Sequence, residues 1–540
     1  MTYQEDTRFP GLDNPTRKDF LRGLALLASG AAFMGPMGAI TGAMAQGAPK
    51  KGGVLAFNLS SSPPNFDPLS NVSSTVLGCI APCYSGLVRF DPMSPDAIIS
   101  DAAKTWTISP DGKTYTFKLF DTIKFHDGKP LTSADALFSL ERMRNPPQGV
   151  VSSRKALLAN VESIAAPDAT TLVITLKRPA TAFLNTLASG WMVILAKHFI
   201  EAGGDPFKTV MGSGPFKFKQ YIEGVSVELV RNPDYFVADR PYLDGLKAFI
   251  VPDQGAVWNY LQAGQLHMWV SIQGSEAGNY KSDAKINIID TPSTSAIGVS
   301  FNTTAGPFTN LALRNAAALA IDREAALNIL QRGQGVFGGP VVPGPWTMDP
   351  KELQKIPGYG LDKAANLAEA KRIMKEAGFE KGGLKVRLLV RRIALFEPVG
   401  VFLKDQWSKI GIETILDVQE NASFFTSQAG KKFDAVVAGI SVNTSDPDDL
   451  GPIHACNSSQ NLSGLCNVDN DKLFAQISEE SDPVKRKQLT NQWEASVAAG
   501  QNMFVMYWRQ RFMGLRRNVN AMVIHPNIDN NSKMQDVWLS

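Results

Sequence analysis

The chain has 540 residues, of which 44% are hydrophobic and 19% are charged, and its formal net charge is +3. This length predicts about two to four domains. The composition is that of a globular protein and excludes a largely disordered chain, and the near balance of charge argues against binding to nucleic acid or to an anionic membrane surface.

Residues 1–45 are typical of an export signal. Basic residues at positions 17, 18 and 22 precede an apolar stretch, residues 24–40, which is interrupted by glycine and proline. The small residues Ala43 and Ala45 follow, at the positions that a signal peptidase recognises. The apolar stretch is too short and too rich in glycine for a membrane span. We therefore expect a signal peptide over residues 1–45.

The export route stays open between two systems. Residues 16–22 read TRKDFLR and resemble the twin-arginine export motif, with Lys18 in place of the second arginine. An ordinary Sec signal is the alternative. No apolar run after residue 45 approaches the length of a membrane span, so we expect the mature chain to be soluble.

Strand and helix signals alternate along the first half of the mature chain. Thr132 or Ser133 can cap a helix over 133–143, and Asp135 favours its first turn. The sequence TYTFKL at 114–119 alternates as a half-buried strand does. The other expected elements are a short strand after Lys51, a helix over 75–87, a strand at 170–176 and a strand pair at 214–221 and 226–232.

The same alternation continues in the second half. Helices are expected over 311–330, over 363–377 with Gly378 as the C-cap, and over 398–411. Strands are expected at 384–390, 413–419 and 433–440. This order of elements predicts α/β construction with mixed sheets.

The four cysteines fall into two pairs. Cys456 and Cys466 enclose a short polar loop, and an exported protein meets an oxidising compartment, so we expect a disulfide between them. Cys79 and Cys83 lie four residues apart, with Pro82 between them. They could be buried thiols, a strained bridge or ligands of a soft metal.

Signatures of catalysis and of cofactor binding are absent. The sequence contains no GxSxG, no HExxH and no P-loop. Residues 333–338 fit GxGxxG, but they follow a predicted helix instead of a strand, so we expect a loop there and no cofactor. The five histidines lack the spacing of a metal site, and only His454, beside an acidic loop, is a candidate for ligand contact.

The acidic loop, residues 441–450 (SVNTSDPDDL), is the main candidate for ligand binding. It follows a predicted strand, and α/β proteins place binding groups where a strand opens into a polar loop. The loop holds Asn443, Asp446, Asp448 and Asp449, and its carboxylates could hold an ammonium group or a cation there. The alternative is that Asp446 and Asp448 only form a turn and cap a helix.

Large aromatic side chains recur where strands are expected to end. Tyr507 and Trp508 are the strongest candidates for ligand contact, because adjacent strand residues face opposite sides and both faces carry rings here. Tyr84 and Phe424 are further candidates. The alternative for each of them is a place in the hydrophobic core.

A series of motifs resembles the family 5 extracellular solute-binding proteins, the dipeptide, oligopeptide and nickel receptors of ABC importers. The longest is TWTISPDGKTYTFKLFDTIKFHDGKPLTSADALFSLERM, residues 105–143. It is followed in order by GSGPFKF (212–218), ELVRNPDYF (228–236) and SFNTTAGPFTNLALRNAAALAIDRE (300–324). The resemblance covers nearly everything after the signal.

The resemblance implies a two-lobe periplasmic binding protein fold, type II and cluster C-like, with a two-strand hinge. Lobe I would comprise residues 46–295, with an extra subdomain over about 85–210, and lobe II residues 296–515. Residues 516–540 would return to lobe I. A monomer in the periplasm would capture a small solute and deliver it to the permease subunits of an ABC transporter.

The resemblance also bears on the ligand. Peptide receptors of the family hold the peptide ammonium with an aspartate, and at the matching position this chain has Asn443. A peptide remains the first expectation, and an opine-like conjugate, an oligosaccharide or a nickel chelate is the alternative. A periplasmic hydrolase, and a chaperone or sensor with the same fold, are hypotheses of other classes.

Overall fold

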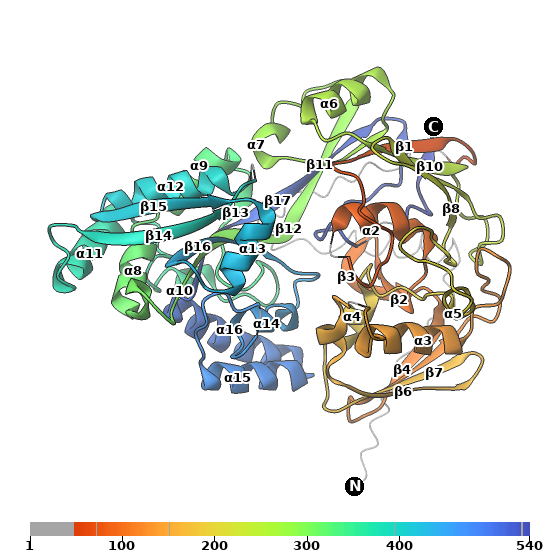
Figure 1. The fold of residues 1–540 in the computed structure, drawn as a ribbon, viewed down its shortest axis with the longest axis horizontal. Coiled ribbons are helices and arrows are strands. Elements are labelled where there is room, and N and C mark those ends of the chain that lie inside the picture. The colour runs from red at the N-terminus through yellow and green to blue at the C-terminus, as the bar shows by residue number, and fades with distance from the viewer. Residues whose placement is uncertain (1–47, 72, 151, 394, 459, 531–532) are drawn as a thin grey trace, which may run out of the picture. The chain divides into compact units, whose positions relative to one another are not determined.

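The computed structural model describes residues 48–540, except residues 72, 151, 394, 459, 531 and 532. The predicted signal peptide, residues 1–45, lies outside the described residues. Strands and helices alternate along the described chain (Figure 1), and the predicted α/β construction is confirmed.

One mixed sheet of eleven strands runs through the structure, in the order β15-β14-β16-β12-β17-β11-β1-β10-β9-β8, with β13 paired to β17. The strands are β1 (Val54–Leu59), β8 (Phe216–Ile222), β9 (Ser226–Arg231), β10 (Gly245–Ile250), β11 (Met268–Ile272), β12 (Ile286–Phe301), β13 (Gly335–Val336), β14 (Leu384–Arg391), β15 (Ile412–Gln419), β16 (Ala435–Ser441) and β17 (Met503–Arg516).

The two longest strands, β12 and β17, form the middle of this sheet. They pair antiparallel from Ile286 opposite Arg516 to Ser300 opposite Met503, with irregular register near Pro292. On one side β12 pairs with β16, and on the other side β17 pairs with β11. The sheet therefore passes through this pair from one set of elements to the other, as Figure 1 shows.

Separate hydrophobic cores lie on the two sides of the β12–β17 pair. Phe57 and Phe117 belong to a core built from the first half of the chain and its C-terminal end, whereas Phe301 and Trp407 belong to a second core. These are the two lobes. The predicted limit at 295/296 falls inside β12, and the limit at 515/516 falls at the end of β17. The domain limits themselves stay predictions.

A second, antiparallel sheet lies within lobe I, in the order β4-β5-β7-β6. Its strands are β4 (Ala103–Ile108), β5 (Thr114–Leu119), β6 (Val161–Asp168) and β7 (Thr171–Leu176), and the helix α3 (Ser133–Arg144) packs against it. Of the two predicted caps of α3, Thr132 and Ser133, it is Thr132 that caps the helix, and it forms a capping box with Asp135 in the first turn. Two short strand pairs complete the lobe, β2 (Val88–Asp91) with β3 (Ser94–Ser100) and β18 (Val519–Asn520) with β19 (Trp538–Leu539).

The remaining helices cover the faces of the main sheet and fill the second lobe. In lobe I they are α2 (Ser74–Ile80), α4 (Phe183–Ala188), α5 (Lys197–Glu201), α6 (Gln254–Ala263) and α7 (Gly274–Ala277). In lobe II they are α8 (Leu311–Leu319), α9 (Arg323–Gln331), α10 (Pro350–Leu353), α11 (Lys363–Glu376), α12 (Glu397–Ser408), α13 (Asn421–Ala429), α14 (Gly451–His454), α15 (Val468–Glu479) and α16 (Pro483–Gly500). No helix in the described part of the chain combines the length and the apolar character needed to cross a membrane.

Two predicted helices have the wrong extent. The single helix expected over 311–330 is two helices, because the Asp322 side chain accepts a hydrogen bond from the Ala325 amide and starts α9 afresh. The helix expected over 75–87 ends at Ile80, and a 3₁₀ turn with Pro82 in its first turn follows.

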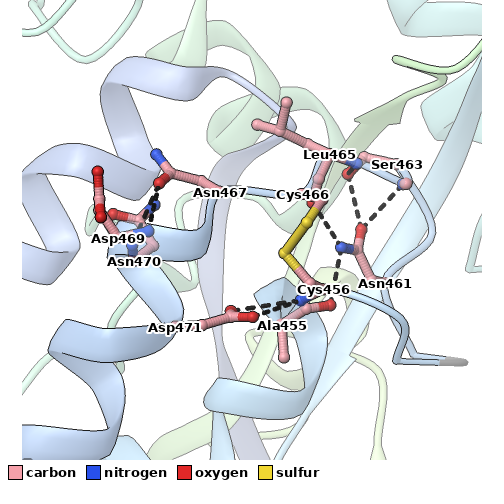
Figure 2. Close-up of a disulfide and its surroundings, with 11 residues drawn as sticks. Ala455, Cys456, Asn461, Ser463, Leu465, Cys466, Asn467, Asp469, Asn470 and Asp471 are labelled. Carbon is pink, nitrogen blue, oxygen red and sulfur yellow. Dashed lines mark hydrogen bonds between the residues drawn. A yellow bond between two sulfur atoms is a disulfide. The ribbon is translucent and has the colours of Figure 1, made fainter.

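A disulfide joins Cys456 and Cys466 beside the start of α15 (Figure 2). Within the loop that it closes, the Asn461 amide donates to the carbonyl oxygens of Ala455 and Leu465. The Asp471 carboxylate accepts a hydrogen bond from the Cys456 amide. The bond thus fixes this loop against α15. Cys79 and Cys83 are buried free thiols and form no bridge with each other, and burial raises the pKa of Cys79 to about 12.

The variant Cys456→Ser/Cys466→Ser should unfold with a free energy about 2–4 kcal/mol smaller than that of the wild type, because the bond restricts the unfolded chain. Chemical denaturation measures the difference. A reductant should lower the stability of the wild type and leave the double variant unchanged. Equal stability of both proteins with and without reductant would contradict this role.

Candidate functional site

The predicted binding loop follows β16 and lies against the C-terminal segment of the chain. The Asn527 side-chain amide donates to the Val442 carbonyl at 2.7 Å, and the Asn530 amide donates to the Asn443 carbonyl at 3.1 Å. The Asn443 side chain is half-buried and makes no hydrogen bond to another described residue. Its amide is therefore available to a ligand.

Asp446 is occupied by an ion pair inside lobe II. Its two carboxylate oxygens each lie 2.7 Å from a guanidinium nitrogen of Arg486, whose side chain is 2% exposed. Asp446 also accepts a hydrogen bond from the Asp448 amide and so starts the 3₁₀ turn Pro447–Asp449. Because both oxygens face Arg486, the structure favours the turn-and-cap alternative for Asp446 over ligand binding.

The two following carboxylates are likewise held within the lobe. Asp448 lies 3.3 Å from Arg486 and accepts a hydrogen bond from the Ser478 hydroxyl. Asp449 accepts hydrogen bonds from the amide and the hydroxyl of Thr444. Burial raises the pKa of Asp448 to about 6 and that of Asp449 to about 7. Neither carboxylate is directed toward Asn443's neighbours in lobe I.

The predicted aromatic contacts lie in hydrophobic cores. Tyr507 and Trp508 face opposite sides of β17, as expected, but both are fully buried, and the Trp508 indole donates to the Gly339 carbonyl. Tyr84 is 1% exposed and Phe424 is 2% exposed. Large rings on both faces of β17 therefore mark a strand with a core on each side, which is the packing alternative stated for these residues.

His454 is also buried in lobe II. One of its ring nitrogens lies 3.2 Å from the Asn502 amide, and its ring packs edge-on against Trp493. Burial lowers the pKa of His454 to about 4, so the ring is neutral at neutral pH. No group of three or more metal-binding side chains occurs in the described ranges.

A cavity of about 270 Å³ lies in lobe I beside the binding loop. Its walls come from β1, α2, the start of α6, β11, β17 and the C-terminal segment. The lining residues are Phe57, Asn58, Leu59, Ser60, Ser74, Thr75, Gly78, Gln254, Met268, Val270, Ser271, Gln273, Arg511, Met513, Met522, Val523, His525, Ile528, Asn530 and Met534. Asn530 connects this cavity to Asn443 through the hydrogen bond described above.

The cavity has the mixed character of a small-molecule site. Methionine and aliphatic side chains supply apolar walls, and amides and hydroxyls supply a few polar contacts. A larger groove, of about 660 Å³, lies between α8 and α11. There Arg372 is already paired with Glu369 and Glu376, and no residue of loop 441–450 lines the groove. We therefore take the cavity in lobe I as the candidate site.

The sequence predictions named none of the residues that line this cavity. Arg511 is the clearest omission. It lies in the polar run Arg509–Arg511, which interrupts an otherwise apolar strand, MFVMYWRQRFMGLR. A run of charged and polar residues in the middle of a buried strand was the available signal. The other lining residues come from segments far apart in the sequence, and no local pattern unites them.

Asp446→Ala is expected to lower the free energy of unfolding by up to about 3–5 kcal/mol, because it removes both short contacts to the buried Arg486 and leaves only Asp448, at 3.3 Å, to balance its charge. Chemical denaturation checks this. Asp469→Ala is the control, since the Asp469 side chain is 89% exposed in its pair with Lys472; such surface pairs contribute about 0–1 kcal/mol. Unchanged stability combined with lost ligand binding would instead assign Asp446 to the ligand.

Asp449→Asn should make stability less dependent on pH. An aspartate of the unfolded chain ionises near pH 4, whereas Asp449 in the folded protein ionises at about 7. Between these values the folded state holds a proton that the unfolded state has lost, so stability falls as the pH rises. We expect the melting temperature of Asp449→Asn to decline less than that of the wild type from pH 5 to pH 8. If the melting temperatures of the variant and the wild type change in parallel with pH, the pKa of Asp449 is not raised and this prediction is wrong.

The sequence matches the bacterial extracellular solute-binding proteins, family 5, over residues 97–461. A putative ABC transporter peptide-binding protein of Brucella abortus (strain 2308) is 30% identical over 452 residues, which are 80% of this chain and 81% of that protein.

Two solved structures are similar in fold. One is the PBP AgaA from A. tumefaciens R10 in complex with agropinic acid, with a TM-score of 0.77, 24% identity, and coverage of 90% of this chain and 99% of AgaA. The other is a dipeptide-binding protein from Pseudoalteromonas sp. SM9913 in complex with Met-Leu, with a TM-score of 0.78, 20% identity, and coverage of 91% and 100%. The predicted two-lobe fold is confirmed, and the chain belongs to the bacterial extracellular solute-binding proteins of family 5.

Proposed function

We propose that this protein is the periplasmic receptor of an ABC importer and that it binds its solute in the lobe I cavity beside Asn443. The observation that carries the proposal is the position of that cavity. It lies where β17 leaves lobe II, and Asn530 on its wall bonds to the lobe II loop. A solute in this cavity that extends toward Asn443 would contact both lobes.

Contact with both lobes provides a mechanism for signalling occupancy. A ligand that makes contacts with both lobes stabilises the arrangement in which they are close, and a permease can recognise that arrangement. Hydrogen bonds between the lobes already support it. The Thr181 amide and hydroxyl donate to the Ser478 carbonyl, and Asn527 donates to Val442. Ligand contacts would add to these bonds.

A peptide-like solute is the first candidate for the ligand. The Brucella relative carries the description peptide-binding, and the Pseudoalteromonas structure holds a dipeptide. A non-peptide solute is the second candidate, and Asn443 favours it, because an amide cannot neutralise an ammonium group. The AgaA structure holds agropinic acid, so the fold itself is compatible with either class.

The other hypotheses have less support. A nickel chelate would need histidine at the cavity, but His454 is in the lobe II core. A hydrolase would need a partnered nucleophile or an acid–base pair, and the raised-pKa carboxylates Asp448 and Asp449 are enclosed in lobe II. We therefore propose a monomeric binding protein that works with permease subunits and without catalysis or a cofactor.

A thermal-shift screen of the mature chain, residues 46–540, tests the receptor role. The compounds are di- and tripeptides, N-acetylated peptides, opine-like conjugates, oligosaccharides and nickel chelates. A ligand at a hundred times its dissociation constant stabilises the folded state by about 2.7 kcal/mol. Absence of any shift across all these classes would count against the proposal.

Asn443→Ala should weaken binding of the most stabilising compound by about three- to tenfold, the usual contribution of one neutral hydrogen bond. The melting temperature without ligand should stay unchanged, because the side chain bonds to no other described residue. Isothermal titration calorimetry measures the affinity. Asn470→Ala, on α15 of the same lobe, is the control and should bind as the wild type does. If Asn443→Ala and Asn470→Ala bind the compound with equal affinity, the Asn443 side chain is not part of the binding site.

A further inference from the structure

Arg511 and His525 are the only ionisable side chains among the twenty residues that line the cavity, and no carboxylate lines it. The His525 ring is engaged on both nitrogens. Its Nδ1 accepts a hydrogen bond from the Asn527 amide, and its Nε2 lies 3.2 Å from the Pro95 carbonyl. The formal charge of the wall therefore comes from Arg511.

The Arg511 guanidinium is only partly satisfied by the protein. One terminal nitrogen donates to the His525 carbonyl at 2.6 Å, and Nε is buried with no partner among the described residues. No described carboxylate forms an ion pair with Arg511. Burial lowers its pKa to about 10, and the charge of Asp529 acts in the opposite direction. The group remains a cation at neutral pH.

The carboxylates near the cavity do not line it. The Asp529 Oδ2 accepts a hydrogen bond from the Trp191 indole, and its Oδ1 is buried without a hydrogen-bond partner among the described residues. Asp446 faces Arg486, and Asp449 faces Thr444. The loop residue that adjoins the cavity, Asn443, is uncharged. An ammonium group entering this site would meet Arg511 with no described carboxylate to balance it.

Two amide side chains of the cavity wall also favour a negatively charged group on the ligand. The Asn58 Oδ1 accepts a hydrogen bond from the Val270 amide, and the Gln254 Oε1 accepts one from the Trp269 indole. The oxygen of each amide thus already accepts one hydrogen bond, whereas the NH₂ groups make none to a described residue and are free to donate to a ligand. The wall therefore offers one cation and several hydrogen-bond donors, which is the set that an anionic oxygen group requires.

We propose that this cavity selects a carboxylate-bearing solute without a positively charged amine, and that Arg511 binds the carboxylate. The inference rests on the proposed receptor function and narrows its ligand class. It covers both N-blocked peptides and amino-acid conjugates whose nitrogen carries no charge. Such a solute would present its carboxylate to lobe I and its uncharged end to the Asn443 amide.

Four compounds on one scaffold test the proposal by calorimetry with the purified protein. N-acetyl-Ala-Ala carries only the carboxylate, Ala-Ala-amide only the ammonium, Ala-Ala both and N-acetyl-Ala-Ala-amide neither. We expect N-acetyl-Ala-Ala to bind about tenfold to a hundredfold more tightly than N-acetyl-Ala-Ala-amide, the usual effect of a charged hydrogen bond. Ala-Ala-amide should bind most weakly.

Variants of the wall identify the responsible group. Arg511→Gln should reduce the affinity for N-acetyl-Ala-Ala to that of its amide, and Arg511→Lys should retain part of the preference. Arg517→Gln removes a charge just beyond the end of β17, outside the cavity, and should leave the preference intact. If Arg511→Gln fails to fold, the affinities of N-acetyl-Ala-Ala and N-acetyl-Ala-Ala-amide for the wild type and for Arg511→Lys test the proposal instead.

The outcomes separate this inference from the receptor role. If Ala-Ala-amide binds as tightly as N-acetyl-Ala-Ala, the protein is still a receptor but the anionic ligand class is wrong. If Arg511→Gln keeps the full preference for the acid, Arg511 is not the binding group and the proposal fails. If none of the four compounds binds to the wild type, both the anionic class on this scaffold and the peptide-like ligand of the proposed function are overturned.

Discussion

The antiparallel pairing of β12 with β17 is the constraint on which the rest of the structure depends. Their paired residues run from Ile286–Arg516 to Ser300–Met503, so one sheet continues from lobe I into lobe II. Backbone hydrogen bonds along two long strands limit how the lobes can be arranged. The same pair brings Arg511 to the lobe I cavity and Trp508 into the lobe II core, only three residues apart.

The use of charge differs sharply between the two sides of the site. In lobe II, the three acidic residues of the loop, Asp446, Asp448 and Asp449, are used internally, and Arg486 pairs with Asp446 and Asp448. In lobe I, Arg511 has no such partner among the described residues. A buried charge that the protein leaves unpaired is costly unless something else compensates it. A ligand carboxylate would supply that compensation, and this links the electrostatics of the cavity to its proposed selectivity.

Membership of a family and choice of ligand are decided by different parts of the chain. The family match spans residues 97–461 and includes the inserted sheet and much of both cores. The cavity wall lies mostly outside that span, in residues 57–78 and 511–534. Shared architecture can therefore accompany a different ligand, because most of the residues that line the cavity lie outside the matched span.

The sequence by itself determined the α/β class and most elements, because hydrophobic periodicity, caps and turns are local, and its resemblance to a known family indicated the two-lobe fold. The strand at 114–119 and the capping box of Thr132 and Asp135 are examples. It also drew attention to Asn443. Only the tertiary structure decided that Asp446 faces Arg486, forty residues away, and that Tyr507 and Trp508 are packed on both faces of β17. Burial and long-range pairing depend on which distant segments meet, and a linear pattern does not contain that information.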